Sequence, residues 1–342
     1  MSAKRTSRSE LRGSSSRSFD KELAELEVLK GATLDAEAIE KLRKALGHRN
    51  NFVVSKAAKL VEANELSALL PEVLAAYDRF FEDAEKADPQ CWAKNALVKA
   101  LVKLEHRDKD AYLRGLRHHQ MEGTWGGTSD TAGTLRGACA HALVNCPGIS
   151  DRELLATLLE LFADADKAVR VEAARAIGNI GGPSAALLLR LRALLGKDEP
   201  EVLGACYSGL LSLDGSRAIP FVARYLEDGD DTSAEAAFAL SETHSPEAMA
   251  ALIARRREGA DSWFGSVLLS AIALCRLPEA MDYLLAIIER DERDAPVAIE
   301  AIGRTAPSAE LRTRVERTVR NAANPRLEQA FRQHLPAPPE RG

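Results

Sequence analysis

The sequence predicts an all-α fold, an α-solenoid of about nine stacked helical hairpins, from its composition and from a repeating pattern. Hydrophobic residues make up 46% of the 342 residues, whereas aromatic residues make up only 5%. This shortage of Phe, Tyr and Trp suits helices that pack through Ala, Leu, Val and Ile, and it argues against a β-sandwich or barrel. A small residue followed by a large aliphatic one also recurs at a nearly constant spacing, which indicates a repeat protein.

Each recurring pair lies in the middle of a predicted helix that follows a turn. The pairs that define the repeat are Ala142-Leu143, Ala176-Ile177, Gly209-Leu210, Ala239-Leu240, Ala271-Ile272 and Ala301-Ile302. Their nearly even spacing is typical of repeats built from helical hairpins. Ala100-Leu101 and Lys59-Leu60 continue the register towards the amino terminus at wider spacings. Because a single helical hairpin cannot bury its own apolar stripe, neighbouring hairpins must stack into one continuous core.

The clearest repeat occupies residues 150–181. Ser150 or Asp151 begins its first helix, and Glu153 is placed to complete a capping box. An Asp-rich turn follows, and the second helix ends at a glycine pair before Pro183 opens the next helix. Two helices joined by a short turn are therefore expected in each repeat.

The second helix of this repeat has one apolar face. Residues at a helical spacing predict its buried stripe, which consists of Val169, Ala173, Ala176, Ile177 and Ile180. Arg175 and Asn179 are expected to point away from the core. Aspartate at position 176 is therefore expected to be far more damaging than aspartate at position 175.

The segment DADKAVRVEAARAIGNIG, residues 164–181, resembles the HEAT-repeat family, especially the short bacterial form found in phycobilisome lyases. The resemblance rests on the turn Asp, the Val-Arg pair and the small residues that follow. It implies an armadillo-type superhelix in which the turn Asp, here Asp164 or Asp166, hydrogen-bonds with Arg170 between repeats. The other repeats are expected to keep the apolar pattern without the Arg. Because members include scaffolds, transport receptors, bilin-attaching lyases and DNA glycosylases, the family implies a fold and little chemistry.

One segment, HHQMEGTWGGTSDT at residues 118–131, interrupts the helical pattern. The spacing between Ala100 and Ala142 leaves room for an inserted loop at the turn between two helices of one hairpin. Insertions in solenoids map to one face, which is often the binding face. The alternative is a surface insertion with Trp125 folded back over the hairpin.

The function predicted from this layout is a non-enzymatic scaffold that binds a protein or peptide in its groove, in the cytoplasm. Second helices line the concave surface in the HEAT family, so outward residues of successive second helices should form columns there. The predicted partner-binding residues belong to the insertion and to two such columns, and they are Trp125, His118, His119, Lys99, His141, Asn145, Arg175 and Asn179. Neither catalytic residues nor a metal or cofactor is predicted.

The runner-up function is an enzyme or maturation factor, either similar to bilin lyases or similar to alkylpurine DNA glycosylases. Cys139 and Cys146 are expected to serve packing, since they lie on or beside an apolar stripe, and a bilin-carrying thiol is suggested only by family analogy. Adjacent histidines such as His118 and His119 usually point apart, and no H-E-x-x-H motif is present. Metal binding is therefore not favoured.

Nucleic-acid binding is also not favoured, because the net charge is −5. An arginine cluster at residues 312–320 and a triplet at residues 255–257 suit phosphates, but acidic residues lie among them. No apolar run approaches the roughly 18 residues of a membrane span. Residues 1–18, basic and Ser-rich, and residues 336–342, Pro-rich, are predicted to be disordered tails that flank the solenoid at residues 19–335.

Overall fold

The computed structural model describes residues 21–31 and 34–336 and confirms the all-α prediction, with 74% of these described residues helical. The predicted tails, residues 1–18 and 336–342, lie outside the described residues except for residue 336. The only strands in the described part form one two-stranded sheet. Within the same part, no helix combines the length and the hydrophobicity needed to cross a bilayer.

The chain divides into two compact units, residues 1–176 and 177–342, and the division falls within helix α10 (Lys167–Ile180). Residues 21–28 are helical, and the first unit continues with α2 (Ala36–Leu46), α3 (Asn51–Ala63), α4 (Leu70–Arg79), α5 (Ala84–Ala87), α6 (Trp92–Lys103), α7 (Lys109–Leu116), α8 (Gly133–Val144) and α9 (Asp151–Phe162). Short 3-10 turns, η1 (Ser67–Leu69) and η2 (Pro89–Cys91), precede α4 and α6.

The second unit contains only helices among its described residues. These are α11 (Gly182–Leu195), α12 (Pro200–Asp214), α13 (Ile219–Ala223), α14 (Asp231–Glu242), α15 (Pro246–Arg257), α16 (Ser262–Leu274), α17 (Pro278–Glu289), α18 (Ala295–Arg304), α19 (Ala309–Ala322) and α20 (Pro325–His334), with 3-10 turns η3 (Gly215–Arg217) and η4 (Arg224–Leu226) flanking α13.

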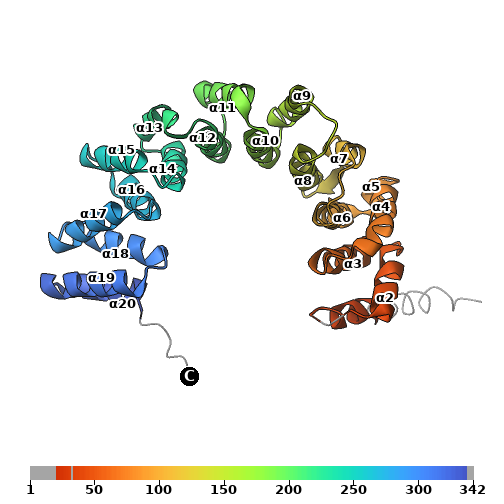
Figure 1. Cartoon of the computed structure of the whole chain (residues 1–342), viewed down its shortest axis with the longest axis horizontal. Helices are drawn as coiled ribbons and strands as arrows, with labels where there is room; N and C mark the ends of the chain where they lie inside the picture. Colours follow the sequence, from red (N-terminus) through yellow and green to blue (C-terminus); the bar gives the residue numbers. More distant parts are fainter. Residues whose placement is uncertain (1–20, 32–33, 337–342) are drawn as a thin grey trace, which may run out of the picture. The chain divides into compact units, whose positions relative to one another are not determined.

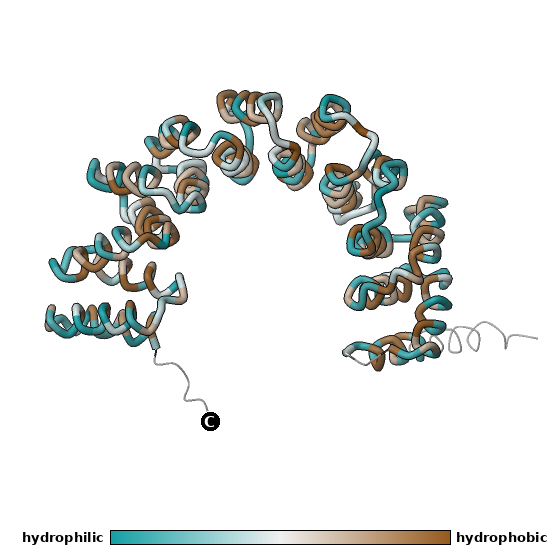
Figure 2. The backbone as a smooth tube through the Cα atoms, viewed as in Figure 1, coloured by the Kyte–Doolittle hydropathy of each residue, from teal (hydrophilic) through white to brown (hydrophobic). Residues whose placement is uncertain are grey.

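Consecutive helices form the nine expected hairpins in the described part of the chain: α2–α3, α4–α6, α7–α8, α9–α10, α11–α12, α13–α14, α15–α16, α17–α18 and α19–α20. Within each unit the second helices of successive hairpins pack in a row (Figure 1). In the first unit α3 contacts α6 and α6 contacts α8, and in the second unit the row runs from α12 through α14, α16 and α18 to α20. Apolar and polar residues alternate along each helix (Figure 2), as helices with one buried face require.

Local signals set the helix ends where the sequence predicts them. The Ser150 side chain accepts a hydrogen bond from the Glu153 N–H, and the Glu153 side chain accepts one from the Ser150 N–H, so α9 begins with a complete capping box. After α10, Gly181 has a φ of +85°, a conformation that glycine adopts without strain. Pro183 then lies in the first turn of α11, where its missing N–H costs no hydrogen bond.

The predicted register of α10 is confirmed. Ala176 is fully buried, whereas its neighbour Arg175 is exposed and pairs with Glu172 at 2.7 Å between Nη1 and Oε1. Four of the five predicted stripe residues are buried, and Ile180 at the helix end is half-buried.

We therefore expect Ala176→Asp to cost several kcal/mol of stability, about 3–5 kcal/mol, because an unpaired carboxylate enters the core. Arg175→Asp should cost under about 1 kcal/mol, because it removes one exposed ion pair. Unfolding in denaturant, followed by circular dichroism, measures both. Equal losses from the two variants would show that the helix is rotated relative to this register.

Candidate functional site

The predicted insertion lies where expected, between α7 and α8 of one hairpin, but it is an ordered β-hairpin and not a loop. Strands β1 (Met121–Thr124) and β2 (Gly127–Asp130) pair antiparallel, with Met121 opposite Asp130 and Thr124 opposite Gly127. A two-residue turn, Trp125-Gly126, connects them, and Gly126 supplies the positive φ of +95°. The repeat spacing therefore predicted the position of the insertion correctly but not its strands.

Trp125 lies at the tip of the β-hairpin with its side chain fully exposed, at 107% relative accessibility. The alternative that Trp125 folds back over the helices is therefore wrong. The largest apolar side chain of the hairpin is thus presented to solvent.

Asp130 fixes the base of the β-hairpin to α8. Its Oδ1 accepts hydrogen bonds from the backbone N–H groups of Gln120 and Ala132, both at 3.0 Å. Its Oδ2 lies 2.6 Å from Nη1 of Arg136 and 2.8 Å from Nδ1 of His119. Burial raises the pKa of the Asp130 carboxyl, but these hydrogen bonds outweigh it and hold the pKa well below its ordinary value.

Arg136 is the centre of this anchor. It is only 1% exposed, although it carries a full positive charge. Besides Asp130, its guanidinium donates to the backbone carbonyl of His118 at 3.1 Å and pairs with Oδ2 of Asp164 at 3.1 Å. A buried Arg with two carboxylate partners thus joins the β-hairpin, α8 and the turn between α9 and α10.

The turn Asp bonds to an Arg of another repeat, as the family resemblance implies, but the Arg that reaches Asp164 is Arg136. Arg170 donates to the backbone carbonyls of Asp164 and Ala165 in its own repeat, at 2.7 and 2.9 Å, while the Asp164 carboxylate receives Arg136 from the preceding repeat. The Asp130 and Arg136 pair lies one repeat before the Asp164 and Arg170 pair and has the same internal spacing. The expectation that other repeats lack this Arg is therefore wrong for the repeat that carries the insertion, and the spacing was the signal that would have revealed it.

A second anchor joins the β-hairpin to the loop before α6. The Gln120 side chain donates from Nε2 to the backbone carbonyl of Asp88 at 2.8 Å and accepts from the Cys91 thiol at 3.3 Å. Oε1 of Glu122 accepts from the backbone N–H of Gln90 at 2.7 Å. Burial raises the pKa of the Glu122 carboxyl, but hydrogen bonds from Gln120, Gln90 and Thr131 outweigh it and lower the pKa.

The loop that receives this anchor contains a buried ion pair. Asp88 and Lys94 are both fully buried, with 3.2 Å between Oδ2 and Nζ. The Asp88 carboxylate also accepts from the N–H groups of Ala93 and Lys94, and it thereby caps α6. Gln90 and Cys91 have φ values of +60° and +53°, a conformation that side chains other than glycine adopt at a cost. The hairpin therefore docks on a strained loop that a buried charge pair holds.

The two adjacent histidines point apart, as predicted. The His118 ring packs edge-on against Phe81 at 5.0 Å, and burial lowers the pKa of the His118 imidazole. His119 is exposed apart from its contact with Asp130. Only His119 therefore presents its ring to solvent beside the β-hairpin.

The predicted columns are partly connected within the first unit. His141 on α8 lies 2.7 Å from Glu172 through its Nε2, and Glu172 also pairs with Arg175. Lys99 on α6 and Asn145 after α8 are exposed. Glu172, absent from the predicted set, is the residue that connects His141 to Arg175.

Asn179 is exposed on α10, as predicted. It belongs to the second unit, whereas the other seven predicted residues belong to the first.

The five cysteines are all buried and unbridged. Burial raises the pKa of Cys139 to about 12 and of Cys206 to about 12, so these thiols stay protonated at neutral pH. Among the described residues, no three His, Cys, Asp or Glu side chains lie close enough to hold a metal ion.

The two arginine clusters contain structural ion pairs. In the carboxyl-terminal cluster Arg314 pairs with Asp282 at 2.6 Å, and Arg320 pairs with Glu316 at 2.9 Å. In the triplet, the Arg256 guanidinium contacts Tyr283, Glu292 and Asp294. Arg314 and Arg256 thus connect different elements within the second unit, whereas the Arg320 pair lies within α19.

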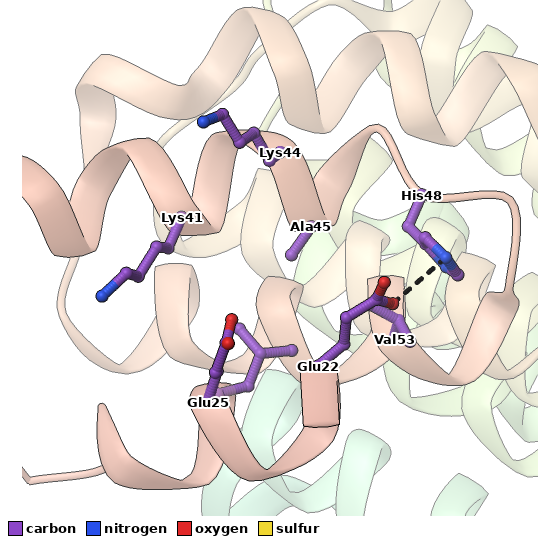
Figure 3. A pocket seen from close by; sticks show the side chains of 8 residues that line it. Glu22, Glu25, Lys41, Lys44, Ala45, His48 and Val53 are labelled. Carbon is purple, nitrogen blue, oxygen red and sulfur yellow. Dashed lines mark ion pairs between the residues drawn. The ribbon is translucent and has the colours of Figure 1, made fainter. Parts of the chain in front are cut away.

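A pocket of about 300 Å³ lies in the first unit between residues 21–28, α2 and the start of α3 (Figure 3). Glu22, Glu25, Lys41 and Lys44 line it, and His48 Nε2 lies 3.2 Å from Glu22. Charges of both signs line this pocket, and none of the predicted binding residues reaches it. The β-hairpin remains the stronger candidate site.

Comparison with known protein families matches HEAT repeats at residues 128–193 and 155–241. The first matched segment begins within β2 and includes Asp130, Arg136 and Asp164. The anchor of the β-hairpin is therefore part of the repeat itself. No curated protein matches the chain significantly.

Proposed function

Residues 128–241 of this chain are HEAT repeats, and from this premise we propose that the protein is a non-enzymatic scaffold that binds a protein or peptide partner. The β-hairpin 121–130 is the principal contact, and Trp125 is its anchor. HEAT repeats offer an extended surface of parallel helices that suits such partners.

The observation that carries this proposal is a fully exposed Trp on a firmly anchored hairpin. Burial of a Trp side chain removes about 150–250 Å² from water. Burial of so large a side chain in a partner pocket makes Trp a frequent hot spot, and truncation of a hot-spot residue costs about 2 kcal/mol or more of binding free energy. Because two sets of hydrogen bonds already order the hairpin, binding costs little further conformational entropy.

The neighbouring predicted residues extend this surface. His119 lies at the hairpin base, and Lys99, His141 and Asn145 lie on or beside second helices of the same unit. These polar side chains offer further hydrogen-bonding groups to a partner that extends from the β-hairpin along the second helices, and polar groups of this kind border the apolar centre of protein interfaces. A partner with an apolar pocket and a polar border fits this arrangement.

We expect Trp125→Ala to weaken partner binding by at least tenfold without lowering the melting temperature, because the side chain makes no intramolecular packing contact worth preserving. A photo-crosslinking residue at position 124, an exposed position beside the intact indole, identifies the partner from native lysate, and calorimetry with the purified partner then measures the affinity. Trp263→Ala is the matched control, since Trp263 is half-exposed on α16. His141→Ala and Asn145→Ala should reduce the affinity by smaller factors.

Two results would contradict the proposal. If Trp125→Ala bound the crosslinked partner with unchanged affinity, the β-hairpin would not be part of the interface. A lower melting temperature with full binding would make Trp125 a structural residue.

A further inference from the structure

The second unit carries a leucine stripe that no part of the hairpin proposal explains. Four leucines of α11 are exposed: Leu187 at 66%, Leu191 at 55%, Leu194 at 58% and Leu195 at 58%. Their spacing of four, three and one residues places them on one face of the helix. Soluble proteins scatter exposed leucines singly, so a continuous stripe of four indicates a contact surface.

The hydrophobic core of the second unit does not include this leucine stripe. The opposite face of α11 is already buried through Ala185, Ala186, Leu189 and Ala193, and α11 packs against α12 of the same unit. Apolar residues consequently occupy both the buried and the exposed face of the helix. A helix that is apolar on both faces is normally buried on both faces.

A basic edge runs beside the leucine stripe. Arg190 lies three residues after Leu187 and four before Leu194, so it borders the stripe on the helix surface. Its guanidinium stacks on Phe221 at 4.2 Å, and the Arg224 guanidinium lies 4.8 Å from the same ring. Arg190 also pairs with Asp214 at 3.5 Å, whereas Arg224 is exposed and has no carboxylate partner among the described residues. Two guanidinium groups on one ring leave an excess of positive charge there.

We propose that α11 docks an amphipathic helix of a partner protein, with the partner's apolar stripe on the four leucines and its acidic edge against Arg190 and Arg224. Helix-in-groove recognition reads such residues at i, i+4 and i+7. The fourteen residues of α11 span about 21 Å, which matches a partner helix of three to four turns. This surface is separate from the β-hairpin and goes beyond the proposed function.

A second copy of this chain fits the surface less well. A two-fold antiparallel pairing of α11 brings like edges together and places Arg190 against its own counterpart. An acidic-edged helix meets the leucines without this repulsion.

The test uses two labelled helical peptides, each long enough for about five turns and with the same leucine stripe. One carries Glu along one edge, and the other carries Lys at the same positions. We expect fluorescence anisotropy to show the Glu peptide binding the full-length protein at least tenfold more tightly than the Lys peptide. Leu191→Ser should weaken the Glu peptide at least tenfold, Arg224→Gln should reduce its preference over the Lys peptide, and Trp125→Ala should change neither.

Several outcomes would overturn this proposal. Equal binding of the two peptides would show that the basic edge does not contribute to recognition. Unchanged binding of the Glu peptide to Leu191→Ser would show that the leucine stripe is not the binding surface. A marked fall in the melting temperature of Leu191→Ser would show that the stripe packs within the chain. A wild-type dimer in sedimentation that Leu191→Ser dissociates would assign the stripe to a second copy. Because Trp125→Ala reports on the hairpin alone, failure here leaves the proposed function intact.

Discussion

Lys94→Ala is expected to lower the free energy of unfolding by about 3–5 kcal/mol. The substitution leaves the Asp88 carboxylate buried without its cation, and removal of one partner of a buried ion pair costs this much because the remaining charge has lost its water. Lys94 Nζ also donates to the backbone carbonyl of Phe80 at 3.1 Å, so that carbonyl loses a partner too. Chemical denaturation followed by circular dichroism measures the loss.

The matched control is Lys99→Ala on the same helix. Lys99 is exposed, so its loss should stay within about 0.5 kcal/mol. A double variant, Asp88→Asn with Lys94→Met, should lose less than the sum of its single substitutions, because it removes both charges together. Equal losses for Lys94→Ala and Lys99→Ala would contradict a buried, paired Lys94.

Lys94→Ala should also loosen the β-hairpin. Asp88 holds the start of α6, and its backbone carbonyl receives the Gln120 side chain. Hydrogen exchange of the amides in residues 121–130 should therefore accelerate in Lys94→Ala and stay unchanged in Lys99→Ala. The stability of the repeat and the presentation of Trp125 are thus physically coupled through one loop.

The sequence predicted the repeat architecture because its signals are local and periodic. The capping box at Ser150, the glycine pair after α10 and the buried positions of Ala173 and Ala176 each follow from residues within one or two turns. Each signal also recurs, so a weak repeat is supported by its neighbours. The nine hairpins and the position of the insertion followed from spacing alone.

The anchors of the hairpin could not be predicted in the same way. Lys94 lies in an apolar stretch of the sequence, where a lone charged residue is normally predicted to be exposed. Only the folded structure shows that Asp88 and the start of α6 surround it. Glu122 and Asp130 look like surface acids in a Gly-rich loop, and only the strand pairing turns them towards their partners. The role of Arg136 could have been predicted from the sequence, because Arg136 occupies the position of Arg170 one repeat earlier.

Arg136→Ala is expected to lower the free energy of unfolding by about 3–5 kcal/mol and to release the β-hairpin from α8. The substitution leaves Asp130 and Asp164 facing each other without the guanidinium that separates them. Both acids are largely buried, with side-chain exposures of 19% and 11%, so water replaces the lost partner poorly. Arg136→Lys should recover only part of the loss, since an ammonium group cannot reach both acids in the planar geometry of guanidinium.

Lowering the pH should reproduce part of this loss of stability in the wild-type protein. The folded pKa of Asp130 lies below its ordinary value, so the carboxylate contributes stability above the ordinary Asp pKa of about 3.9. That contribution is lost as the pH falls from there towards the lower folded pKa. In Arg136→Ala the folded pKa of Asp130 should rise, so its acid transition should begin at a higher pH than in the wild type.

Trp125 reports the release directly in a variant with Trp92→Phe and Trp263→Phe, which leaves one indole. We expect the steady-state anisotropy of Trp125 to fall on Arg136→Ala, because the anchored strands then move as a loop on the nanosecond timescale. Arg175→Ala is the control, since Arg175 pairs with an acid on its own helix and touches no part of the hairpin. If the anisotropy held while stability fell, the contacts of Gln120 and Glu122 with the loop before α6 would be sufficient to fix the hairpin, and Arg136 would serve the stacking of repeats alone.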